Sequence, residues 1–203
     1  MNESPRTIFF DGIAEKWDAW EDLPALMGKL ASGLEDLGIG SGEAVLDVGC
    51  GTGNLTMALL AKLSASGRIV AIDISSRMIE IARKKAGDPR VEWHTADARR
   101  LPLEEGTIDR AICCSVWPHF EDRRAVAKEL YRVLRPGGCL HVWHLASREH
   151  INEVHASAGE AVQHDMLPPA AETSDLLARS GFLVTTKVDD EERYLVTALK
   201  PKR

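Results

Sequence analysis

Three glycines at alternate positions, Gly49, Gly51 and Gly53, follow a short apolar run that begins at Ala44. This order of residues predicts a buried strand, a tight turn and the start of a helix. Glycine allows backbone conformations that other residues avoid and lets a ligand approach the main chain closely. The helix N-terminus that follows can face a carboxylate. The segment therefore predicts a site for a nucleotide-like ligand.

The glycine spacing distinguishes between two cofactors. The dinucleotide fingerprint Gly-x-Gly-x-x-Gly would need glycine at positions 49, 51 and 54, but position 54 is Asn54. NAD is therefore disfavoured. S-adenosylmethionine lacks a pyrophosphate and carries a carboxylate, so we expect it to be the ligand.

Two acidic residues follow the next two apolar runs. Asp73 comes about 20 residues after the last glycine, where a carboxylate can accept hydrogen bonds from both ribose hydroxyls. Asp97 and Ala98 follow the third run and offer adenine a side-chain acceptor and a backbone donor. Each acidic residue alone could be a cap or turn residue. Together with the glycine turn, they predict three contacts to one cofactor.

Histidines concentrate in the second half of the chain, where five of the seven fall between His141 and His164. Ligands of open α/β sheets bind beyond the carboxyl ends of the strands. His119, after the fourth apolar run, and His144, near the end of the fifth, are therefore expected to converge there. Either imidazole could remove a proton from a substrate or orient it. The alternative is a structural histidine that caps or hydrogen-bonds.

The same histidines could also suggest a metal site. His150 and His155 are five positions apart, a poor fit to the i, i+4 spacing that places two ligands on one helix face. A chelate for zinc, iron or manganese would need His144, His164 or Asp165 from a fold-back of the chain. We therefore expect no resident metal and interpret the stretch as a polar lid over the substrate pocket.

Short apolar runs alternate with amphipathic stretches, which is typical of an α/β fold with a parallel sheet and helices on both faces. The expected strands are 44–48, 68–72, 91–95, 109–114 and 139–146, and the expected helices between them are 54–64, 75–85 and 122–134. The Arg135–Gly138 turn should end the last of these helices and start the fifth strand. Residues 182–188 and 193–199 suit a hairpin, so the sheet should end antiparallel, after a helix over 174–180. Residues 11–37 should form two helices broken near Pro24.

The sequence now resembles a known family, the class I S-adenosylmethionine-dependent methyltransferases, and within it the group similar to ubiquinone/menaquinone biosynthesis methyltransferases. The resemblance covers most of the chain and rests on Phe10–Asp18, Asp47–Gly53, Asp73, Asp97-Ala98 and Leu134–Gly138. It implies a Rossmann-like seven-stranded sheet, mostly parallel with an antiparallel last strand and helices on both faces. It also implies methyl transfer from S-adenosylmethionine to a small-molecule acceptor.

The resemblance implies roles for individual residues. The loop glycines would hold the methionine portion, Asp73 the ribose, and Asp97 and Ala98 the adenine, whose edge Met78 would cover. The expected cofactor-binding residues are Asp47, Gly49, Gly51, Gly53, Asp73, Met78, Asp97, Ala98 and Ser115. The catalytic candidates are His119 and His144, and the substrate-binding candidates are Trp17, Trp117, His155 and His164. The front motif ends in Trp17-Asp18 where the family commonly has Tyr-Asp, so a phenolic hydroxyl is missing.

Composition and charge indicate which kinds of partner and location the protein has. The 203 residues include 25 Lys and Arg against 31 Asp and Glu, a net charge of −6 without a basic block, which argues against nucleic-acid binding. We expect a single methyltransferase domain over 1–203, with an N-terminal helical cap at 1–40 and a His-rich lid at 147–171. Four cysteines without a Cys-x-x-Cys pair, no signal peptide and no long apolar run predict a cytoplasmic protein without membrane insertion.

Other interpretations remain open. The chain could bind the cofactor as a non-catalytic regulator or partner subunit, or act as a metal-assisted methyltransferase that uses the His-rich segment. A nicotinamide oxidoreductase ranks last because of Asn54. Core packing is expected for Trp20 and Trp143, and an exposed seventh strand leaves a homodimer open.

Overall fold

The computed structural model describes residues 4–202, so Met1–Glu3 of the expected N-terminal cap and Arg203 lie outside it. The chain divides into a first unit, Met1–Asp97, and a second unit, Ala98–Arg203. The expectation of one domain over 1–203 stays a prediction. Between residues 4 and 202, no helix has the length and apolar character needed to cross a bilayer.

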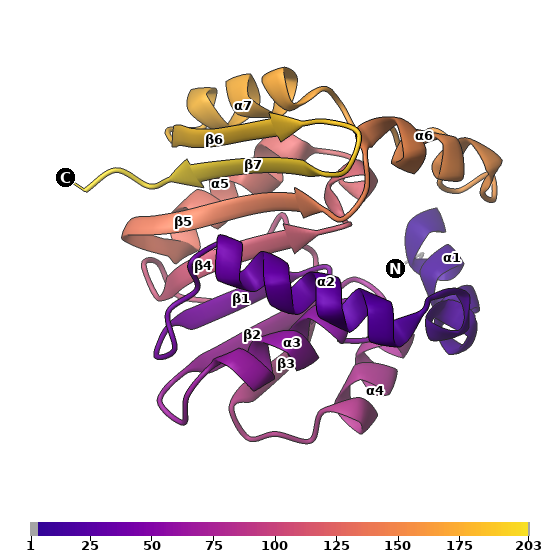
Figure 1. The fold of residues 1–203 in the computed structure, drawn as a ribbon, viewed down its shortest axis with the longest axis horizontal. Helices are drawn as coiled ribbons and strands as arrows, with labels where there is room; N and C mark the ends of the chain where they lie inside the picture. The colour runs from indigo at the N-terminus through magenta and orange to yellow at the C-terminus, as the bar shows by residue number, and fades with distance from the viewer. Residues whose placement is uncertain (1–3, 203) are drawn as a thin grey trace. The chain divides into compact units, whose positions relative to one another are not determined.

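Three parallel strands form the sheet of the first unit, in the order β3-β2-β1 (Figure 1). They are β1 (Ala44–Val48), β2 (Arg68–Asp73) and β3 (Val91–Thr95). All five side chains of β1 are buried, as is typical of a parallel strand covered on both faces. The helices are α1 (Pro5–Ile13), α2 (Leu23–Asp36), α3 (Asn54–Lys62) and α4 (Ser76–Lys85), with a 3₁₀ helix, η1 (Ala14–Trp20).

The N-terminal helices are broken near Pro24 as expected, but they begin earlier in the chain. Pro24 lies in the first turn of α2, where its missing N–H costs nothing, and Asp22 caps that helix by accepting from the Ala25 N–H. The expected break between two helical segments near Pro24 is thus present, between η1 and α2, and what differs is that α1 begins at Pro5, ahead of the expected start. The expectation that Trp20 packs in the core is wrong, because its position at the end of η1 leaves it 62% exposed.

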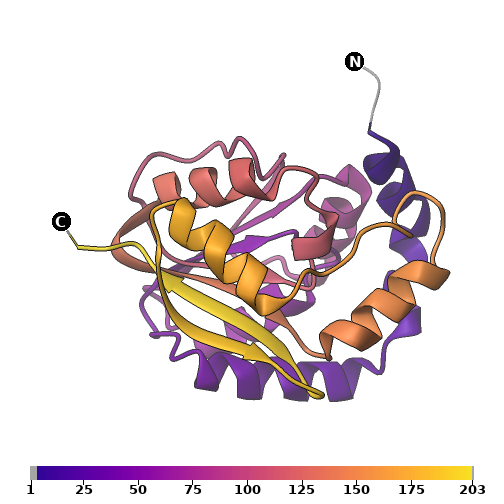
Figure 2. The same ribbon diagram turned by 90° about the horizontal axis from the view of Figure 1, so that it is seen from above.

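Four strands form the sheet of the second unit, in the order β4-β5-β7-β6. They are β4 (Ile108–Cys114), β5 (Leu134–His144), β6 (Leu183–Asp189) and β7 (Tyr194–Leu199). The helices are η2 (Trp117–His119), α5 (Arg123–Val133), α6 (Arg148–Ser157) and α7 (Ala170–Arg179). In Figure 2, α7 lies along the β6–β7 hairpin and α6 extends away from the end of β5.

The strand order of the seven-stranded sheet is β3-β2-β1-β4-β5-β7-β6, and β7 runs antiparallel to both β5 and β6. The α/β class and the reversed last strand predicted from the sequence are confirmed. The strand exposed at the edge is β6, not β7 as expected. Because β7 inserts between β5 and β6, its Tyr194 and Val196 are fully buried, whereas Leu183 of β6 is 58% exposed.

The Arg135–Gly138 segment does not act as a turn before the fifth strand. Strand β5 already begins at Leu134, and its register with β4 shifts between Ile108 and Arg110. The Gly137 N–H donates to the Lys200 carbonyl at 2.7 Å, and the Lys200 N–H donates to the Gly138 carbonyl at 2.9 Å. These hydrogen bonds to the C-terminal chain continue the pairing, and Gly137 has a φ of +81°, a backbone conformation that favours glycine.

Candidate functional site

The glycine loop, residues 49–53, leaves β1 through left-handed backbone conformations. The φ angles are +68° at Gly49, +53° at Gly51 and +86° at Gly53, a region that costs other residues about 1–2 kcal/mol. The Cys50 N–H donates to the Ile72 carbonyl at 2.8 Å, and the Gly53 N–H donates to the Cys50 carbonyl at 2.9 Å. The loop backbone is thus fixed against the end of β2 before α3 begins.

Asp73, at the end of β2, supports this loop. Its Oδ2 accepts from the Gly51 N–H and its Oδ1 accepts from the Ser75 N–H, both at 2.9 Å. Because each carboxylate oxygen can accept two hydrogen bonds, these contacts are compatible with a diol bound at the same carboxylate. A Cβ at Gly51 would meet nothing within 4 Å except Trp17 Nε1 at 3.9 Å, so a ligand can approach the main chain there. These residues fit the ribose and the methionine portion of S-adenosylmethionine.

Gly53 has a different role from Gly51. A Cβ at this position would lie 3.1 Å from Ala82 Cβ and 3.2 Å from Trp93 Cη2. The missing side chain therefore lets the start of α3 pack closely against α4 and β3. The third glycine of the loop serves packing at least as much as ligand approach.

We expect Gly53→Ala to lower the free energy of unfolding by about 1–3 kcal/mol, because the new Cβ adds both backbone strain and a clash. Thermal unfolding measures the change, at about 2–4 °C for each kcal/mol. Gly28→Ala is the matched control, since Gly28 lies within α2 with nothing within 4 Å of its Cβ position. The control should be neutral or slightly stabilising. An unchanged melting temperature in Gly53→Ala would contradict the packing role.

Asp47 lies one residue before the end of β1 and is 1% exposed. Its Oδ2 accepts from the Thr56 hydroxyl at 2.6 Å. Burial raises the pKa of Asp47 to about 7, the charge of Asp73 raises it further, and the Thr56 hydrogen bonds partly oppose the shift. The carboxyl group therefore changes protonation near neutral pH and joins the base of the loop to α3.

The raised pKa of Asp47 predicts a pH-dependent stability. An unfolded Asp titrates near pH ~3.9, so between about pH 4 and 7 the folded protein holds one proton more than the unfolded chain. The free energy of unfolding should then fall by about 1.4 kcal/mol per pH unit as the pH rises through this window. Asp47→Asn removes this contribution and keeps an oxygen for Thr56. Urea unfolding at pH 5, 6 and 7 should show a shallower pH dependence in Asp47→Asn than in wild type or in the exposed control Asp175→Asn. Parallel curves would contradict the assignment.

A polar network joins the front motif, residues 10–18, to the glycine loop. Asp18 Oδ1 accepts from the Thr52 hydroxyl at 2.6 Å and from Asn54 Nδ2 at 3.1 Å. Lys85 Nζ donates to Asp18 Oδ2 at 2.8 Å and to Asn54 Oδ1 at 2.7 Å. Burial alone would raise the pKa of Asp18, but the hydrogen bonds from Lys85, Thr52 and Asn54 outweigh it and lower the pKa. The network holds η1 against the loop.

Trp17 lies beside the loop, with its ring centroid 6.2 Å from those of both Phe10 and Trp20. Its Nε1 is the atom nearest to the Cβ position of Gly51. The chain therefore presents an indole N–H near the loop although the phenolic hydroxyl common in the family is missing. Asp11 fixes the same segment to α4, since it accepts from the Ser75 hydroxyl and, at 3.2 Å, from the Arg77 N–H.

The other cofactor candidates lie at separate places in the two units. Met78, in the first turn of α4, is 1% exposed. Asp97 closes the first unit after β3, and Ala98 opens the second. Ser115 follows β4 with a φ of +55°, the one positive value outside glycine in the described part of the chain, and its N–H donates to the Trp143 carbonyl at 2.9 Å. A non-glycine residue in this conformation is frequent at functional sites.

A histidine cluster lies within the second unit, formed by His119, His144, His155 and Asp165. His119 Nδ1 is 2.8 Å from Asp165 Oδ2. The His119 and His155 ring centroids are 4.8 Å apart, and His155 Nδ1 hydrogen-bonds the main-chain carbonyl of Asp165. The Asp165 side chain is 3% exposed and that of His119 is 13% exposed. The sequence offers Asp165 only as a candidate metal ligand and carries no signal for its contact with His119.

His144 is the buried member of the cluster. Its ring is 1% exposed and packs edge-on against Tyr194, at a centroid distance of 5.6 Å. Burial, followed by the charges of His119 and His155, lowers the pKa of His144 to about 3, so the ring is neutral at physiological pH. Within residues 4–202, His144 Nε2 and Trp117 Nε1 are buried atoms with no hydrogen-bond partner.

The remaining histidines of the rich stretch do not join this cluster. His150 and His164 are exposed, and His141 hydrogen-bonds Thr197 Oγ1 at 3.0 Å from within β5. Burial, with a smaller contribution from Arg110, lowers the pKa of His141 to about 3. Among the described residues, no three His, Cys, Asp or Glu side chains are placed to hold a metal ion.

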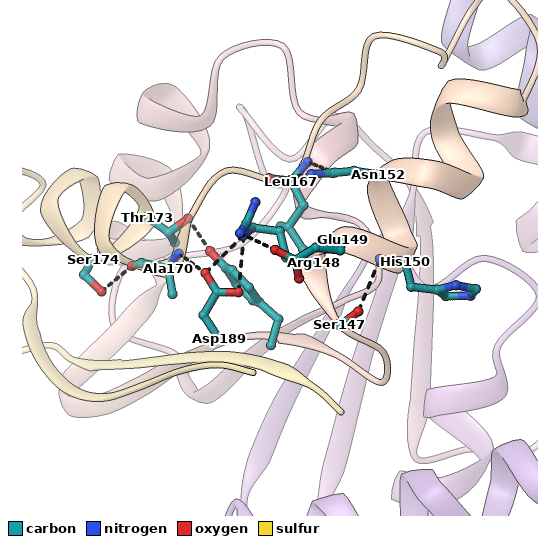
Figure 3. Close-up of polar contacts among 11 residues, drawn as sticks. Ser147, Arg148, Glu149, His150, Asn152, Leu167, Ala170, Thr173, Ser174 and Asp189 are labelled. Atoms are coloured by element: carbon teal, nitrogen blue, oxygen red, sulfur yellow. Dashed lines mark hydrogen bonds and ion pairs between the residues drawn. The ribbon is translucent and has the colours of Figure 1, made fainter. Parts of the chain in front are cut away.

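The segment that carries His155 and Asp165 is fixed at several points (Figure 3). Arg148, at the start of α6, pairs with Asp189 at the end of β6, with Nε and Oδ2 3.2 Å apart. The same Asp189 Oδ2 accepts from the Ala170 N–H at 3.0 Å and so caps α7. Between these ends, Asn152 donates to and accepts from the main chain of Leu167, at 3.2 and 2.7 Å. The expected lid, 147–171, is therefore an ordered fold-back.

A mostly parallel sheet with a reversed strand, a glycine loop after β1 and an acidic residue at the end of β2 together define a nucleotide-type cofactor-binding protein. A family model described as a methyltransferase domain matches residues 45–138. The chain is 31% identical to the methyltransferase GfsG of Streptomyces halstedii, over 98% of this chain and 77% of that protein. It belongs to the class I S-adenosylmethionine-dependent methyltransferases.

Two further comparisons agree with this membership. The chain is 28% identical to the ubiquinone/menaquinone biosynthesis C-methyltransferase UbiE of Klebsiella pneumoniae, over 94% of this chain and 74% of that protein. Its fold matches the crystal structure of a SAM-dependent methyltransferase from Aquifex aeolicus with a TM-score of 0.77 and 22% identity, over 93% of this chain and 97% of that one. The chain spans 31% and 57% of the lengths of two other curated relatives.

Proposed function

We propose that this chain transfers the methyl group of S-adenosylmethionine to a small-molecule acceptor. The observation that carries the proposal is the contact between Asp73 and the Gly51 N–H, which joins the glycine loop after β1 to the acidic residue after β2. The two elements that would hold the methionine portion and the ribose are thus parts of one hydrogen-bonded structure. Family membership supports the same cofactor.

Individual cofactor contacts follow from this arrangement. Gly49 and Gly51 offer backbone to the methionine portion, and Asp73 offers its carboxylate to the ribose hydroxyls. Asp97 and Ala98 are proposed to contact adenine, with Met78 at its edge. Asp47, Gly53 and Ser115 act by shaping the backbone around these groups, as their burial, packing and φ angle suggest.

When bound, the cofactor supplies a methyl group already activated by its sulfonium, so the protein mainly aligns the acceptor and excludes water. Alignment alone can provide effective molarities of about 10⁵–10⁸ M. We assign the base to His119, because its side chain is partly exposed and paired with Asp165. His144 is buried and neutral, which suits a group that orients the acceptor or the cluster.

The substrate candidates differ in their support. Trp17 faces the glycine loop, and His155 packs on His119, so both are proposed to contact the acceptor. Trp117 is fully buried and would contribute only its indole N–H. His164 is exposed and makes no side-chain contact that supports a role.

A small, partly apolar acceptor suits the acidic chain better than a nucleic acid, which would need a basic surface. No disulfide joins the four cysteines, all of which lie within the described residues, in keeping with the proposed cytoplasmic location.

The test measures S-adenosylhomocysteine formation with phenol, amine, thiol and carboxylic acceptors, each with and without a divalent metal or a chelator. We expect turnover with at least one class and no effect of the chelator. Tight cofactor binding without turnover on any class would favour the non-catalytic regulator instead. Loss of turnover on chelation would favour the metal-assisted alternative.

A further inference from the structure

We propose that Asp165 is a positioning residue that holds His119 as a general base for an acceptor that reacts through a phenolic or enolic hydroxyl. This inference rests on the proposed methyl transfer and deepens it. The contacts that carry it, those of His119, His155 and Asp165, all lie within the second unit. The chemistry of these contacts gives both the orientation of the base and the class of acceptor.

The contact between His119 and Asp165 selects one tautomer of the imidazole. His119 Nδ1 lies 2.8 Å from Asp165 Oδ2. An ionised carboxylate can only accept hydrogen bonds, so the proposal places the proton of the His119 ring on Nδ1. The lone pair of the ring is then on Nε2. A carboxylate that fixes the tautomer of a catalytic histidine and stabilises the imidazolium that forms is an established catalytic arrangement in hydrolases.

Asp165 is itself held in place by its surroundings. Its side chain is nearly fully buried, and its N–H donates to the Val162 carbonyl at 2.9 Å. His155, from the last turn of α6, hydrogen-bonds its carbonyl oxygen. Arg123 Nη2 donates to the neighbouring Met166 carbonyl at 2.9 Å. The carboxylate therefore has a defined position from which to orient His119.

A base is useful only for an acceptor that must lose a proton to react. A carboxylic acid is already ionised at neutral pH, because free carboxyl groups titrate near pH ~4. A phenol resembles Tyr, with a pKa of about 10, and a positioned base can accelerate its reaction by about 10²–10⁴-fold. The paired histidine therefore favours a hydroxyl of this acidity over a carboxylate.

Two buried polar atoms of the second unit also favour a methyl acceptor that reacts through an oxygen atom. Trp117 Nε1 can only donate a hydrogen bond, and neither it nor His144 Nε2 has a partner in the described part of the chain. Trp117 lies on η2 together with His119, and the pKa of His144 responds to the charge of His119. An acceptor oxygen could satisfy such groups, whereas a wholly apolar acceptor would leave them unpaired.

The step balances without another reactant. His119 Nε2 takes the hydroxyl proton as the acceptor oxygen forms its bond to the methyl carbon. The electron pair of the broken carbon–sulfur bond stays on sulfur, which gives S-adenosylhomocysteine and the methyl ether. His119 then releases its proton to solvent, so one proton is released for each methyl group transferred.

The tautomer can be tested without turnover. Long-range ¹H–¹⁵N NMR spectra of the purified chain, with His119 assigned by comparison with His119→Gln, should show the proton on Nδ1. Asp165→Asn should change the His119 ring signals, whereas the exposed control Asp175→Asn should not. A proton on Nε2 in the wild-type protein would overturn the proposal.

Kinetics then separate positioning from a structural role. We expect Asp165→Asn to lower kcat about 10²-fold or more with a weakly acidic phenol, with little change in the KM for the acceptor. The loss should shrink across a phenol series toward nitrophenols that are already ionised at the assay pH. It should also vanish in a His119→Gln background, because Asp165 acts through His119. A loss of equal size for every phenol, or one additive with His119→Gln, would show a structural role and overturn the proposal.

The two proposals fail in different ways. S-adenosylhomocysteine formed only with amines or carboxylates would leave methyl transfer intact and overturn the hydroxyl acceptor. If the chain neither binds S-adenosylhomocysteine nor turns over with any acceptor, the proposed function itself is overturned, even if the NMR spectra show the expected tautomer.

Discussion

Asp73→Ala should weaken S-adenosylhomocysteine binding by about 10²–10⁴-fold. The estimate takes two hydrogen bonds from the ribose to a charged carboxylate, at about 1.5–3 kcal/mol each. The substitution also removes the acceptor of the Gly51 and Ser75 N–H groups, so the loop loses its support from the end of β2. Isothermal titration calorimetry measures the change in Kd directly.

Two variants control this experiment. Asp73→Asn keeps one acceptor oxygen and should fall between wild type and Asp73→Ala. His119→Gln, altered in the second unit, should bind S-adenosylhomocysteine as wild type does. Thermal unfolding of Asp73→Ala reports whether the chain remains folded. An Asp73→Ala protein that is folded and binds with unchanged affinity would remove Asp73 from the cofactor site.

His119→Gln should lower kcat by about 10²–10⁴-fold for an acceptor that must lose a proton, because glutamine cannot serve as a base. Cofactor affinity should not change, since no cofactor contact is assigned to His119. Steady-state formation of S-adenosylhomocysteine, measured at saturating cofactor, provides the rate.

The matched control for His119→Gln is His150→Gln. His150 is an exposed histidine near the start of α6, and its backbone N–H donates to Ser147 Oγ at 3.2 Å. Its rate should equal that of wild type. A rate reduced equally by both substitutions would show that the effect is not specific to the paired histidine.

Much of the fold was predictable because local signals and tertiary structure agree. Strands β1 and β3 have the bounds expected from their apolar runs, and Ser75 caps α4 as its position suggested. The local sequence pattern was insufficient where a residue distant in the sequence pairs with the segment. Lys200 pairs with the Arg135–Gly138 segment from the far end of the chain, so a segment read as a turn is part of β5.

The candidate site shows the same limit. The glycine loop and Asp73 are adjacent to their own strands, so their order in the sequence was informative. Lys85 meets Asp18 from 67 positions away, and Asp165 meets His119 from 46 positions away. No periodicity or motif links such pairs. The Asp165 carboxylate reaches His119 because the chain turns back after α6, and this fold-back has no signal in the sequence.

The central claim is that the loop of residues 49–53 and Asp73 bind S-adenosylmethionine. Calorimetric titration of the wild-type chain with S-adenosylhomocysteine, and separately with NADH, tests it most directly. We predict saturable binding of one S-adenosylhomocysteine per chain and no heat of binding with NADH. Binding of NADH in preference, or no binding of S-adenosylhomocysteine, would contradict the account.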